Sequence, residues 1–284
     1  MPGTGAGQSL WDARLSEPGS PVCAPDWLAL REPADAAARA PELAELAADH
    51  LGRGPLTVRD LGCGTGSMLR WLAPQLRGPQ RWYLHDRDPV LLARAAAGAI
   101  GGVEVETVEG DLTALGAADL AGTSLVTASA LLDLLTVEEV DGLAAACVDA
   151  GCAALLTLSV AGRVVFDPPE QLDAEFAAAF DAHQRRAVDG RRLLGPDSGA
   201  AAVAAFADRG ATVTHRSSPW RLGATEAALT EEWLRGWIGA ACAQEPELEQ
   251  FAGDYLNRRL DAIAAGRLQV LVDHVDVLAI PGRR

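Results

Sequence analysis

Lysine is absent from this chain, and all 24 of its basic residues are arginine. Against them stand 39 acidic residues, which gives a formal net charge of −15 at pH 7. A protein that binds nucleic acid needs cationic surface to displace the counterions of the phosphates, and anionic membranes attract basic proteins. The charge therefore predicts no nucleic-acid partner and no membrane partner.

Cysteine pairs, long apolar runs and targeting signals are also missing. The five cysteines form an odd number without a CxxC pair, so we expect no disulfide framework and no metal site. No run of about 18 apolar residues predicts a membrane span, and no basic flank before an apolar run predicts a signal peptide. We expect a cytoplasmic protein with free thiols that acts on a small molecule, and the sequence leaves a homodimer open.

Strand-like and helix-like segments alternate through the middle of the chain. Strands are predicted at 57–61, 82–85, 103–108, 124–129 and 153–159, helices at 67–76, 89–97 and 137–150, and a last strand at 268–280. Repeated strand–helix units with short links predict a parallel sheet with helices on both faces. The fold class is therefore α/β, with a doubly wound and mostly parallel sheet.

The rhythm and composition divide the chain into five regions. They are a flexible tail (1–22), N-terminal helices (23–55), a cofactor-binding core (56–161), a helical insertion that forms a cap (162–196) and the remainder of the sheet domain (197–284) with helices at 225–265. Within the insertion, Pro168-Pro169 stops the preceding segment, a helix is expected from Glu170 to about Val188, and Asp189-Gly190 predicts a turn.

A glycine-rich loop follows the first predicted strand. It reads Asp60-Leu61-Gly62-Cys63-Gly64-Thr65-Gly66-Ser67. Glycines let the backbone turn tightly and approach a ligand, and the next helix N-terminus favours an anionic group, either a diphosphate or an amino-acid carboxylate. Dinucleotide-binding loops carry Gly or Ala at the position of Ser67. Ser67 and the preceding acid Asp60 favour the amino-acid ligand.

An acid followed by GxGxG resembles motif I of class I S-adenosylmethionine-dependent methyltransferases. The resemblance covers about 60–133 and implies a Rossmann-like fold of seven strands, an enzyme, and S-adenosyl-L-methionine as cofactor. It implies that Asp60 helps to hold the methionine ammonium and that the backbone of Gly62, Cys63, Gly64 and Gly66 faces the methionyl part.

The ends of later strands supply the other expected cofactor contacts. Asp86 ends the second strand, where a carboxylate can accept hydrogen bonds from both ribose hydroxyls. Nicotinamide enzymes use the same device, so Asp86 does not separate the two cofactors. The resemblance implies that Asp111 accepts from the adenine amino group and that Leu112 packs on the ring. The predicted cofactor set also contains Arg87, Gly110, Ala128 and Ser129.

Methyl transfer requires alignment, and for an oxygen or nitrogen acceptor a protein base can assist it. His183 is one candidate base because its ordinary pKa lies near neutrality, and Asp133 is the second. The expected substrate contacts are Trp27, Arg31, Arg186 and Trp220. Arg185, Arg186, Arg191 and Arg192 form a basic cluster. This cluster could hold a carboxylate or phosphate of the substrate, or it could form ordinary ion pairs on a solvated helix face.

Two other functions remain open at this point. One is a nicotinamide-dependent oxidoreductase on the same kind of sheet. The other is a non-catalytic scaffold that binds S-adenosylmethionine, because methyltransferases have no obligatory catalytic side chain. The sequence names neither the substrate nor the acceptor atom.

Overall fold

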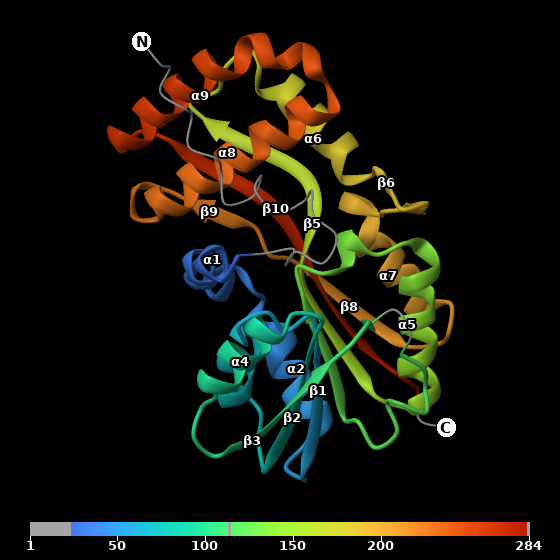
Figure 1. The fold of residues 1–284 in the computed structure, drawn as a ribbon. Coiled ribbons are helices and arrows are strands. Elements are labelled where there is room, and N and C mark those ends of the chain that lie inside the picture. Colours follow the sequence, from blue (N-terminus) through green and yellow to red (C-terminus); the bar gives the residue numbers. More distant parts are fainter. Residues whose placement is uncertain (1–23, 113–114, 283–284) are drawn as a thin grey trace.

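The computed structural model describes residues 24–112 and 115–282, and the expected tail at 1–22 lies outside this range. The helices are α1 (Pro25–Ala38), α2 (Pro41–Leu51), α3 (Ser67–Leu72), α4 (Pro89–Ala97), α5 (Val137–Ala150), α6 (Asp173–Gln184), α7 (Ser198–Ala207), α8 (Ala227–Gln244) and α9 (Glu249–Ala264). The strands are β1 (Leu56–Leu61), β2 (Gln80–Asp86), β3 (Val103–Glu109), β4 (Leu125–Ser129), β5 (Ala153–Asp167), β6 (Ala187–Val188), β7 (Arg191–Arg192), β8 (Thr212–Ser217), β9 (Trp220–Leu222) and β10 (Gln269–Ile280). Figure 1 shows their arrangement.

One large sheet organises the chain. Its strand order is β3-β2-β1-β4-β5-β10-β8, and β9 pairs with β10 beside this path. Strands β1 to β5 pair in parallel, whereas β10 runs antiparallel between β5 and β8. The predicted α/β, mostly parallel sheet is confirmed, and the last strand predicted at 268–280 is β10.

Local signals set the helix boundaries in the core. Thr136 and Glu139 form a capping box at the start of α5, and Gly151 in the left-handed conformation ends it. Asp88 caps α4 through the Val90 N–H, with Pro89 in the first turn. These devices depend on a few neighbouring residues, so the sequence predicted the boundaries well.

Helices cover both faces of the sheet. On one face, α2, α3 and α4 bury apolar side chains against β1 and β2, with Trp82 at the centre. On the other face, α5 and α7 pack against β4 and β5. The two core clusters leave the carboxyl ends of β1, β2 and β4 at one edge, where a doubly wound fold binds its ligands.

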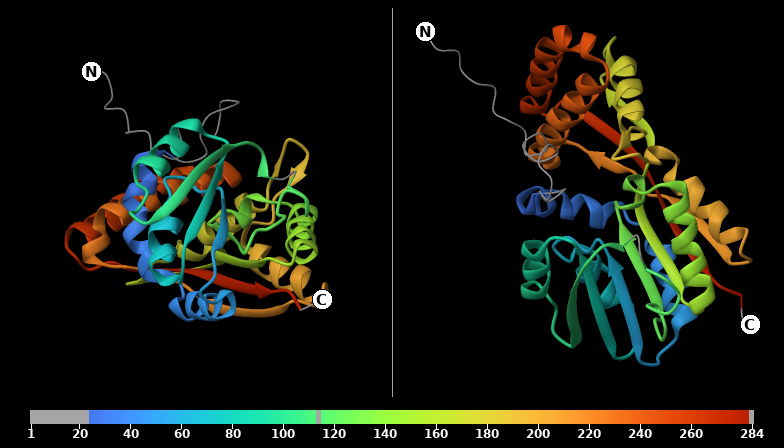
Figure 2. Two further views of the ribbon diagram at one scale, coloured as in Figure 1. Left: turned by 90° about the horizontal axis from the view of Figure 1, so that it is seen from below. Right: turned by 45° about the vertical axis from the view of Figure 1, so that its right-hand side comes forward.

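A second lobe is built around the two long strands β5 and β10, which extend beyond this edge of the sheet. β5 continues to Asp167 and pairs with β10 along its whole length, as Figure 1 shows. Helices α6, α8 and α9 pack around these strands, and the views in Figure 2 agree on this arrangement. We call the helices and strand ends of this lobe the cap.

The prediction for the start of this region was wrong in two respects. The strand was expected to end at Ser159 and a helical insertion to begin at 162, but this segment is the second half of β5. The helix expected over 170–188 is the shorter α6, and the hairpin β6–β7 follows it, turning at the predicted Asp189-Gly190. The error arose because β10, which is far away in sequence, supplies the hydrogen-bond partners of β5. In the described part of the chain, no helix combines the length and the apolar character that a membrane span requires.

Candidate functional site

The glycine loop turns between β1 and α3 with three residues in the left-handed region. Gly62, Gly64 and Gly66 have φ angles of 63°, 54° and 83°. The loop is closed by hydrogen bonds from the Gly66 N–H to the Cys63 carbonyl (2.8 Å) and from the Cys63 N–H to the His85 carbonyl (2.9 Å). Other side chains would strain these conformations, so the turn requires glycine.

Asp86 holds this loop from the end of β2. Its Oδ2 accepts a hydrogen bond from the Gly64 N–H (2.9 Å), and its Oδ1 accepts one from the Asp88 N–H (3.0 Å). A carboxylate has about four acceptor positions, so two remain for the hydroxyls of a ribose. The structure therefore gives the predicted ribose acceptor a second task, which is to fix the loop.

Asp60 is buried at the end of β1 with only half of its carboxylate satisfied. Its Oδ1 accepts a hydrogen bond from Thr127 Oγ1 (2.7 Å), but its Oδ2 is buried without a partner among the described residues. Burial raises the pKa of Asp60 to about 7, while the Thr127 hydrogen bond and the charge of Arg39 oppose that shift. A cation placed against Oδ2 would stabilise the charged form.

Arg39 is the functional candidate that the sequence analysis missed. It caps the C-terminus of α1 and is 2% exposed, and its Nη2 donates to Ser67 Oγ (3.1 Å) and Ser129 Oγ (2.9 Å). Its Nε and Nη1 are buried without hydrogen-bond partners among the described residues. Burial lowers the pKa of Arg39, and nearby carboxylates partly oppose this shift. The only sequence feature that pointed towards Arg39 was its hydrogen-bond partner Ser67, which departs from the dinucleotide-binding pattern.

The two unsatisfied groups have opposite charges. Asp60 Oδ2 lacks a donor, and Arg39 lacks an acceptor at two nitrogens. Both residues lie at the carboxyl edge of the sheet, beside the glycine loop. The methionyl part of S-adenosylmethionine carries an ammonium and a carboxylate, so the residues present fit that end of the cofactor. A diphosphate would leave Asp60 uncompensated.

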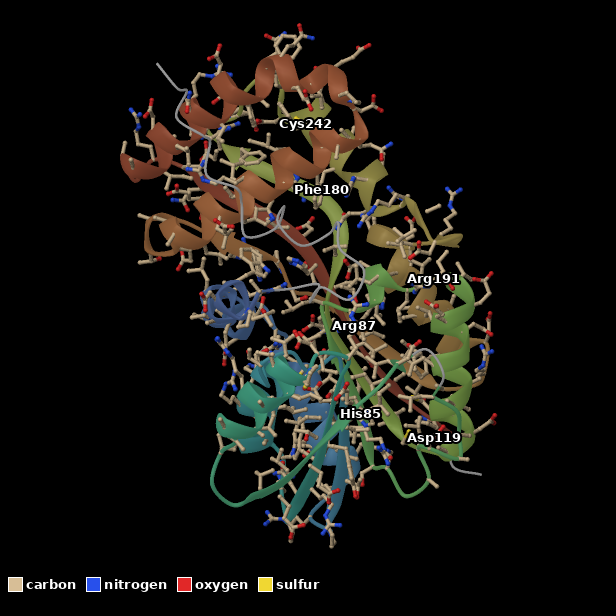
Figure 3. The ribbon with its side chains drawn as sticks, viewed as in Figure 1. His85, Arg87, Asp119, Phe180, Arg191 and Cys242 are labelled. Carbon is tan, nitrogen blue, oxygen red and sulfur yellow. The ribbon has the colours of Figure 1, made fainter. Side chains whose placement is uncertain are left out.

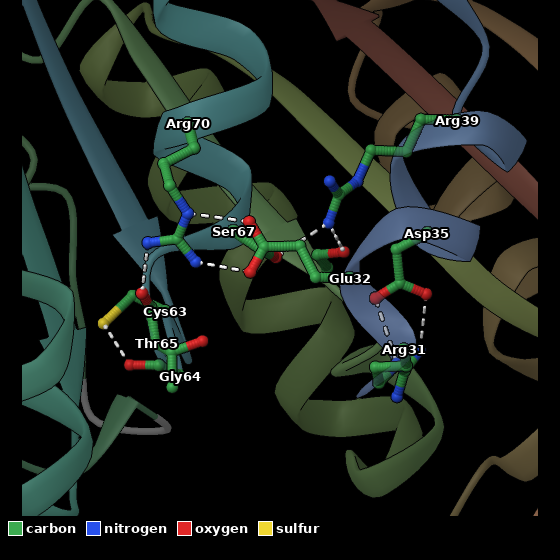
Figure 4. A network of polar contacts seen from close by, with 10 residues as sticks. Arg31, Glu32, Asp35, Arg39, Cys63, Gly64, Thr65, Ser67 and Arg70 are labelled. Carbon is green, nitrogen blue, oxygen red and sulfur yellow. Dashed lines mark hydrogen bonds and ion pairs between the residues drawn. The ribbon is translucent and has the colours of Figure 1, made fainter. Parts of the chain in front are cut away.

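Helix α1 covers the glycine loop and is fastened to it. A Cβ added to Gly64 would lie 3.1 Å from Leu28 of α1. Glu32 of α1 accepts two hydrogen bonds from Arg70 of α3 (2.6 and 2.7 Å), and Arg70 also donates to the Thr65 carbonyl (2.6 Å). Figure 4 shows this network. Because Leu28 lies directly against Gly64, a ligand that binds at the glycine loop must either displace α1 or bind between α1 and the loop.

The remaining predicted cofactor residues fall into two environments. Arg87 is exposed and, in Figure 3, lies between the lower sheet and the cap. Gly110 donates its N–H to the Asp86 carbonyl (3.2 Å), which brings the end of β3 beside β2, and Asp111 next to it is exposed. Leu112 is partly buried against the core under α5, and Ala128 is part of that core.

On the other side of α1, the structure brings three predicted residues together. Asp133 lies in a short 3-10 helix (Leu132–Leu134) after β4, and its Oδ1 is buried without a hydrogen-bond partner among the described residues. Burial raises the pKa of Asp133, while Arg31 and Arg186 oppose that shift. Arg31 comes from α1 and Arg186 follows α6, so cations from two parts of the fold influence the Asp133 carboxyl group.

Trp27, Arg31 and Trp220 form one cluster that joins α1 to β9. The Arg31 guanidinium lies 5.9 Å from the Trp27 ring centroid and 4.9 Å from that of Trp220. Asp35 accepts hydrogen bonds from Trp220 Nε1 (2.9 Å) and Arg31 Nε (3.0 Å). Trp27 and Trp220 are 2% and 3% exposed, so they pack α1 against β9. Arg31 is the polar residue of this cluster.

His183 lies in the last turn of α6. Burial and, to a smaller extent, the charge of Arg186 together lower its pKa to about 4. The imidazole is therefore neutral but weakly basic at pH 7. Burial shifts the pKa of Asp133 in the opposite direction, upward from its ordinary value. No group of three His, Cys, Asp or Glu side chains within the described ranges is arranged to hold a metal ion.

Comparisons with known proteins agree with this geometry. Residues 58–150, which contain the loop, Asp86 and Asp133, match the family of methyltransferase domains. No match was found among curated protein sequences.

Three solved structures resemble the fold. They are a cyclopropane synthase from Mycobacterium tuberculosis (16% identity, 83% of this chain and 82% of that chain, TM-score 0.46), a putative methyltransferase from Bacillus halodurans C-125 (15%, 85% and 98%, TM-score 0.49) and a SAM-dependent methyltransferase from Geobacter sulfurreducens in complex with S-adenosyl-L-homocysteine (17%, 91% and 99%, TM-score 0.44).

Proposed function

We propose that the chain is a class I S-adenosylmethionine-dependent methyltransferase that transfers a methyl group to a small molecule, since residues 58–150 match the family of methyltransferase domains. The nicotinamide alternative is wrong, because the matched family is that of methyltransferases. The observation that carries the proposal is the pair of unsatisfied, oppositely charged groups of Asp60 and Arg39 beside the glycine loop. A small acceptor is supported by the net charge of −15, which disfavours nucleic acid.

The residues around the loop would hold the cofactor in three places. Asp60 would bind the ammonium group, and Arg39 would bind the carboxylate. Asp86 would accept hydrogen bonds from the ribose hydroxyls with the lone pairs that do not already accept from the loop. When bound, S-adenosylmethionine supplies an activated methyl group with a thioether leaving group. The protein contributes the alignment of this methyl group with its acceptor, and the backbone hydrogen bonds that fix the glycine loop provide that alignment.

Asp133 would receive the proton of the acceptor. It lies in the short 3-10 helix shortly after β4, whose last residue, Ser129, contacts Arg39. A hydroxyl or amine held against Asp133 Oδ1 would give that atom the donor it lacks, and the raised pKa favours proton uptake. Arg31 and Arg186 would orient the acceptor from either side.

Calorimetry with S-adenosylhomocysteine tests the cofactor assignment. Asp86→Ala should weaken binding about 10- to 100-fold, because it removes a charged acceptor and loosens Gly64. Asp88→Ala is the matched control. Asp88 only caps α4 through the Val90 N–H, so its loss should leave the affinity within about twofold. No heat of binding from the wild-type protein at millimolar ligand would end the proposal.

Turnover tests the acceptor side. A panel of small hydroxyl, amine and carboxyl compounds would be incubated with S-adenosylmethionine, and the formation of S-adenosylhomocysteine would be measured. With an active acceptor, Asp133→Asn should lower kcat about 100-fold or more while the affinity for S-adenosylhomocysteine is unchanged. Unaltered kcat would remove Asp133 from its role, and His183→Gln is the next variant to examine.

A further inference from the structure

The structure separates the four clustered arginines into two pairs. Arg185 donates two hydrogen bonds to Asp197 (2.7 and 2.9 Å), and Arg191 donates two to Glu139 (3.0 and 2.7 Å). These two cations are therefore neutralised by forked carboxylate pairs. They form the ordinary ion pairs that such a cluster usually contains.

Arg186 and Arg192 have no such partner. Within the described residues, neither makes an ion pair, and the Arg186 side chain donates a hydrogen bond to the His183 carbonyl (2.9 Å). Arg192 lies near Asp197, but both oxygens of that carboxylate already accept from Arg185. In a chain with 39 acidic and 24 basic residues, two neighbouring cations that form no ion pair are unexpected on composition alone.

These two arginines line the same hollow. Its volume is about 560 Å³, and it lies between the end of α6, the hairpin β6–β7 and the last residue of α8. Its lining consists of three alanines and of Asp181, Arg185, Arg186, Arg192 and Gln244. The alanines leave the space open, and the polar members surround it.

The charge of this lining favours an anion. Arg185 is balanced by Asp197, which leaves Arg186 and Arg192 against the single carboxyl of Asp181. Burial raises the pKa of Asp181 to about 6, which further reduces its negative charge in mildly acidic solution. The hollow therefore carries about one net positive charge.

The hollow also adjoins the acceptor side of the site. Arg186 lies near enough to Asp133 for each charge to influence the pKa of the other, and it lines the hollow as well. A molecule with its reactive atom at Asp133 could therefore extend past Arg186 into this space.

We propose that the hollow at the end of α6 binds a carboxylate or phosphate group of the methyl acceptor, with Arg186 and Arg192 as its ligands. Guanidinium groups suit this task because their planar N–H forks match the oxygens of both anions. The inference rests on the proposed function, since it narrows the acceptors to anionic small molecules.

Titration with two probes, inorganic phosphate and acetate, tests the site. The Nε–H signals of arginine would be followed by nuclear magnetic resonance in the wild-type protein and in four variants: Arg186→Gln, Arg192→Gln, Arg185→Gln and Arg191→Gln. We expect saturable shifts at Arg186 and Arg192 with at least one probe. Each of their variants should lose affinity about 10-fold, whereas Arg191→Gln should stay within about twofold. The stronger probe identifies the anion class.

Asp181→Asn serves as a gain-of-binding variant. Removing the one uncompensated carboxyl should tighten the binding of the stronger probe about two- to fivefold, because a like charge leaves the site. A loss of affinity in this variant would contradict the anion assignment.

Equal shifts at all four arginines, or no saturation at millimolar probe, would overturn the inference. Calorimetry with S-adenosylhomocysteine on the same samples distinguishes a failure of the anion site from a failure of the proposed function. A protein that binds this ligand but neither anion keeps its proposed function and loses the anion site, whereas one that binds only the anions loses the methyltransferase proposal.

Discussion

The cofactor side and the cap hold their side chains by different means. Around the glycine loop, hydrogen bonds from backbone groups fix the functional residues, as the Gly64 N–H does for Asp86. In the cap, aromatic packing gives order: Trp237 has ring centroids 5.3 Å from Phe166 and 5.9 Å from Phe176. Backbone hydrogen bonds set positions narrowly, whereas packed rings set the distance between whole elements.

Helix α1 belongs to both systems. Its Arg39 reaches the cofactor side, while its Arg31 faces Asp133 on the acceptor side. Ion pairs fasten it to the core at Arg70, and buried hydrogen bonds fasten it to β9 at Trp220. A movement of α1 would therefore change both halves of the site together, while a change inside the cap should leave the cofactor seat intact.

Trp237→Ala is the strongest way to test this independence. Trp237 is 1% exposed at the centre of the cap, so its loss should lower the free energy of unfolding by about 3–5 kcal/mol. The affinity for S-adenosylhomocysteine should stay within about twofold. Urea unfolding and calorimetry measure the two quantities. Phe251→Ala is the matched control, because Phe251 is 44% exposed in the same lobe and should cost less than about 1 kcal/mol. A large loss of affinity would show that the cap shapes the cofactor seat.

Asp60→Asn probes the buried carboxyl of the cofactor side. Because its pKa is about 7 in the folded protein and 3.8 ordinarily, the folded state keeps a proton over this range that the unfolded chain has released. Stability of the wild type should therefore fall as pH rises from 4 to 7. Between pH 5 and pH 8, the variant should gain about 2–3 kcal/mol relative to the wild type, measured by urea unfolding. An unchanged difference at the two pH values would contradict the raised pKa.

Arg39→Gln separates a cofactor contact from a structural one. We expect the affinity for S-adenosylhomocysteine to fall about 10- to 100-fold, because a charge-assisted hydrogen bond to the carboxylate is lost. The affinity for 5′-methylthioadenosine, which has no amino-acid carboxylate, should change less than about twofold. Arg70→Gln is the control: Arg70 holds the loop at Thr65, so its loss should affect both ligands alike. Equal losses in Arg39→Gln would make Arg39 a packing residue.

Glu32→Gln has the smallest expected effect and tests how firmly α1 is held. The Glu32–Arg70 pair is partly exposed, with each side chain at 27%, so its loss should cost about 0.5–1 kcal/mol. The difference should shrink at 1 M salt, where such pairs are screened. Urea unfolding at two salt concentrations measures it. Asp49→Asn removes a more exposed pair with Arg77 and should have no measurable effect. A cost above about 2 kcal/mol would mean that α1 is more rigidly bound than this contact indicates.

How well the sequence predicts the site depends on whether its residues are close in the sequence or are brought together by the fold. Asp60, the three glycines and Asp86 lie within one strand–loop–helix–strand unit, so their spacing in the sequence fixes their geometry. Arg39 lies in no motif, and only the path of α1 across the sheet edge brings it to Ser67 and Ser129. His183 and Asp133 stay predicted bases, and only the structure shows that burial raises the pKa of Asp133 and lowers that of His183.

Sequence by itself determined the parallel core, its capped helices and the acid-preceded glycine loop, because each of these depends on residues a few positions apart. Tertiary structure alone decided that β5 runs on beside β10, that α6 joins α8 and α9 in one cap, and that two of four arginines remain without carboxylates. Those outcomes depend on partners more than 50 residues away or on ion pairs chosen in three dimensions, and no local pattern encodes them.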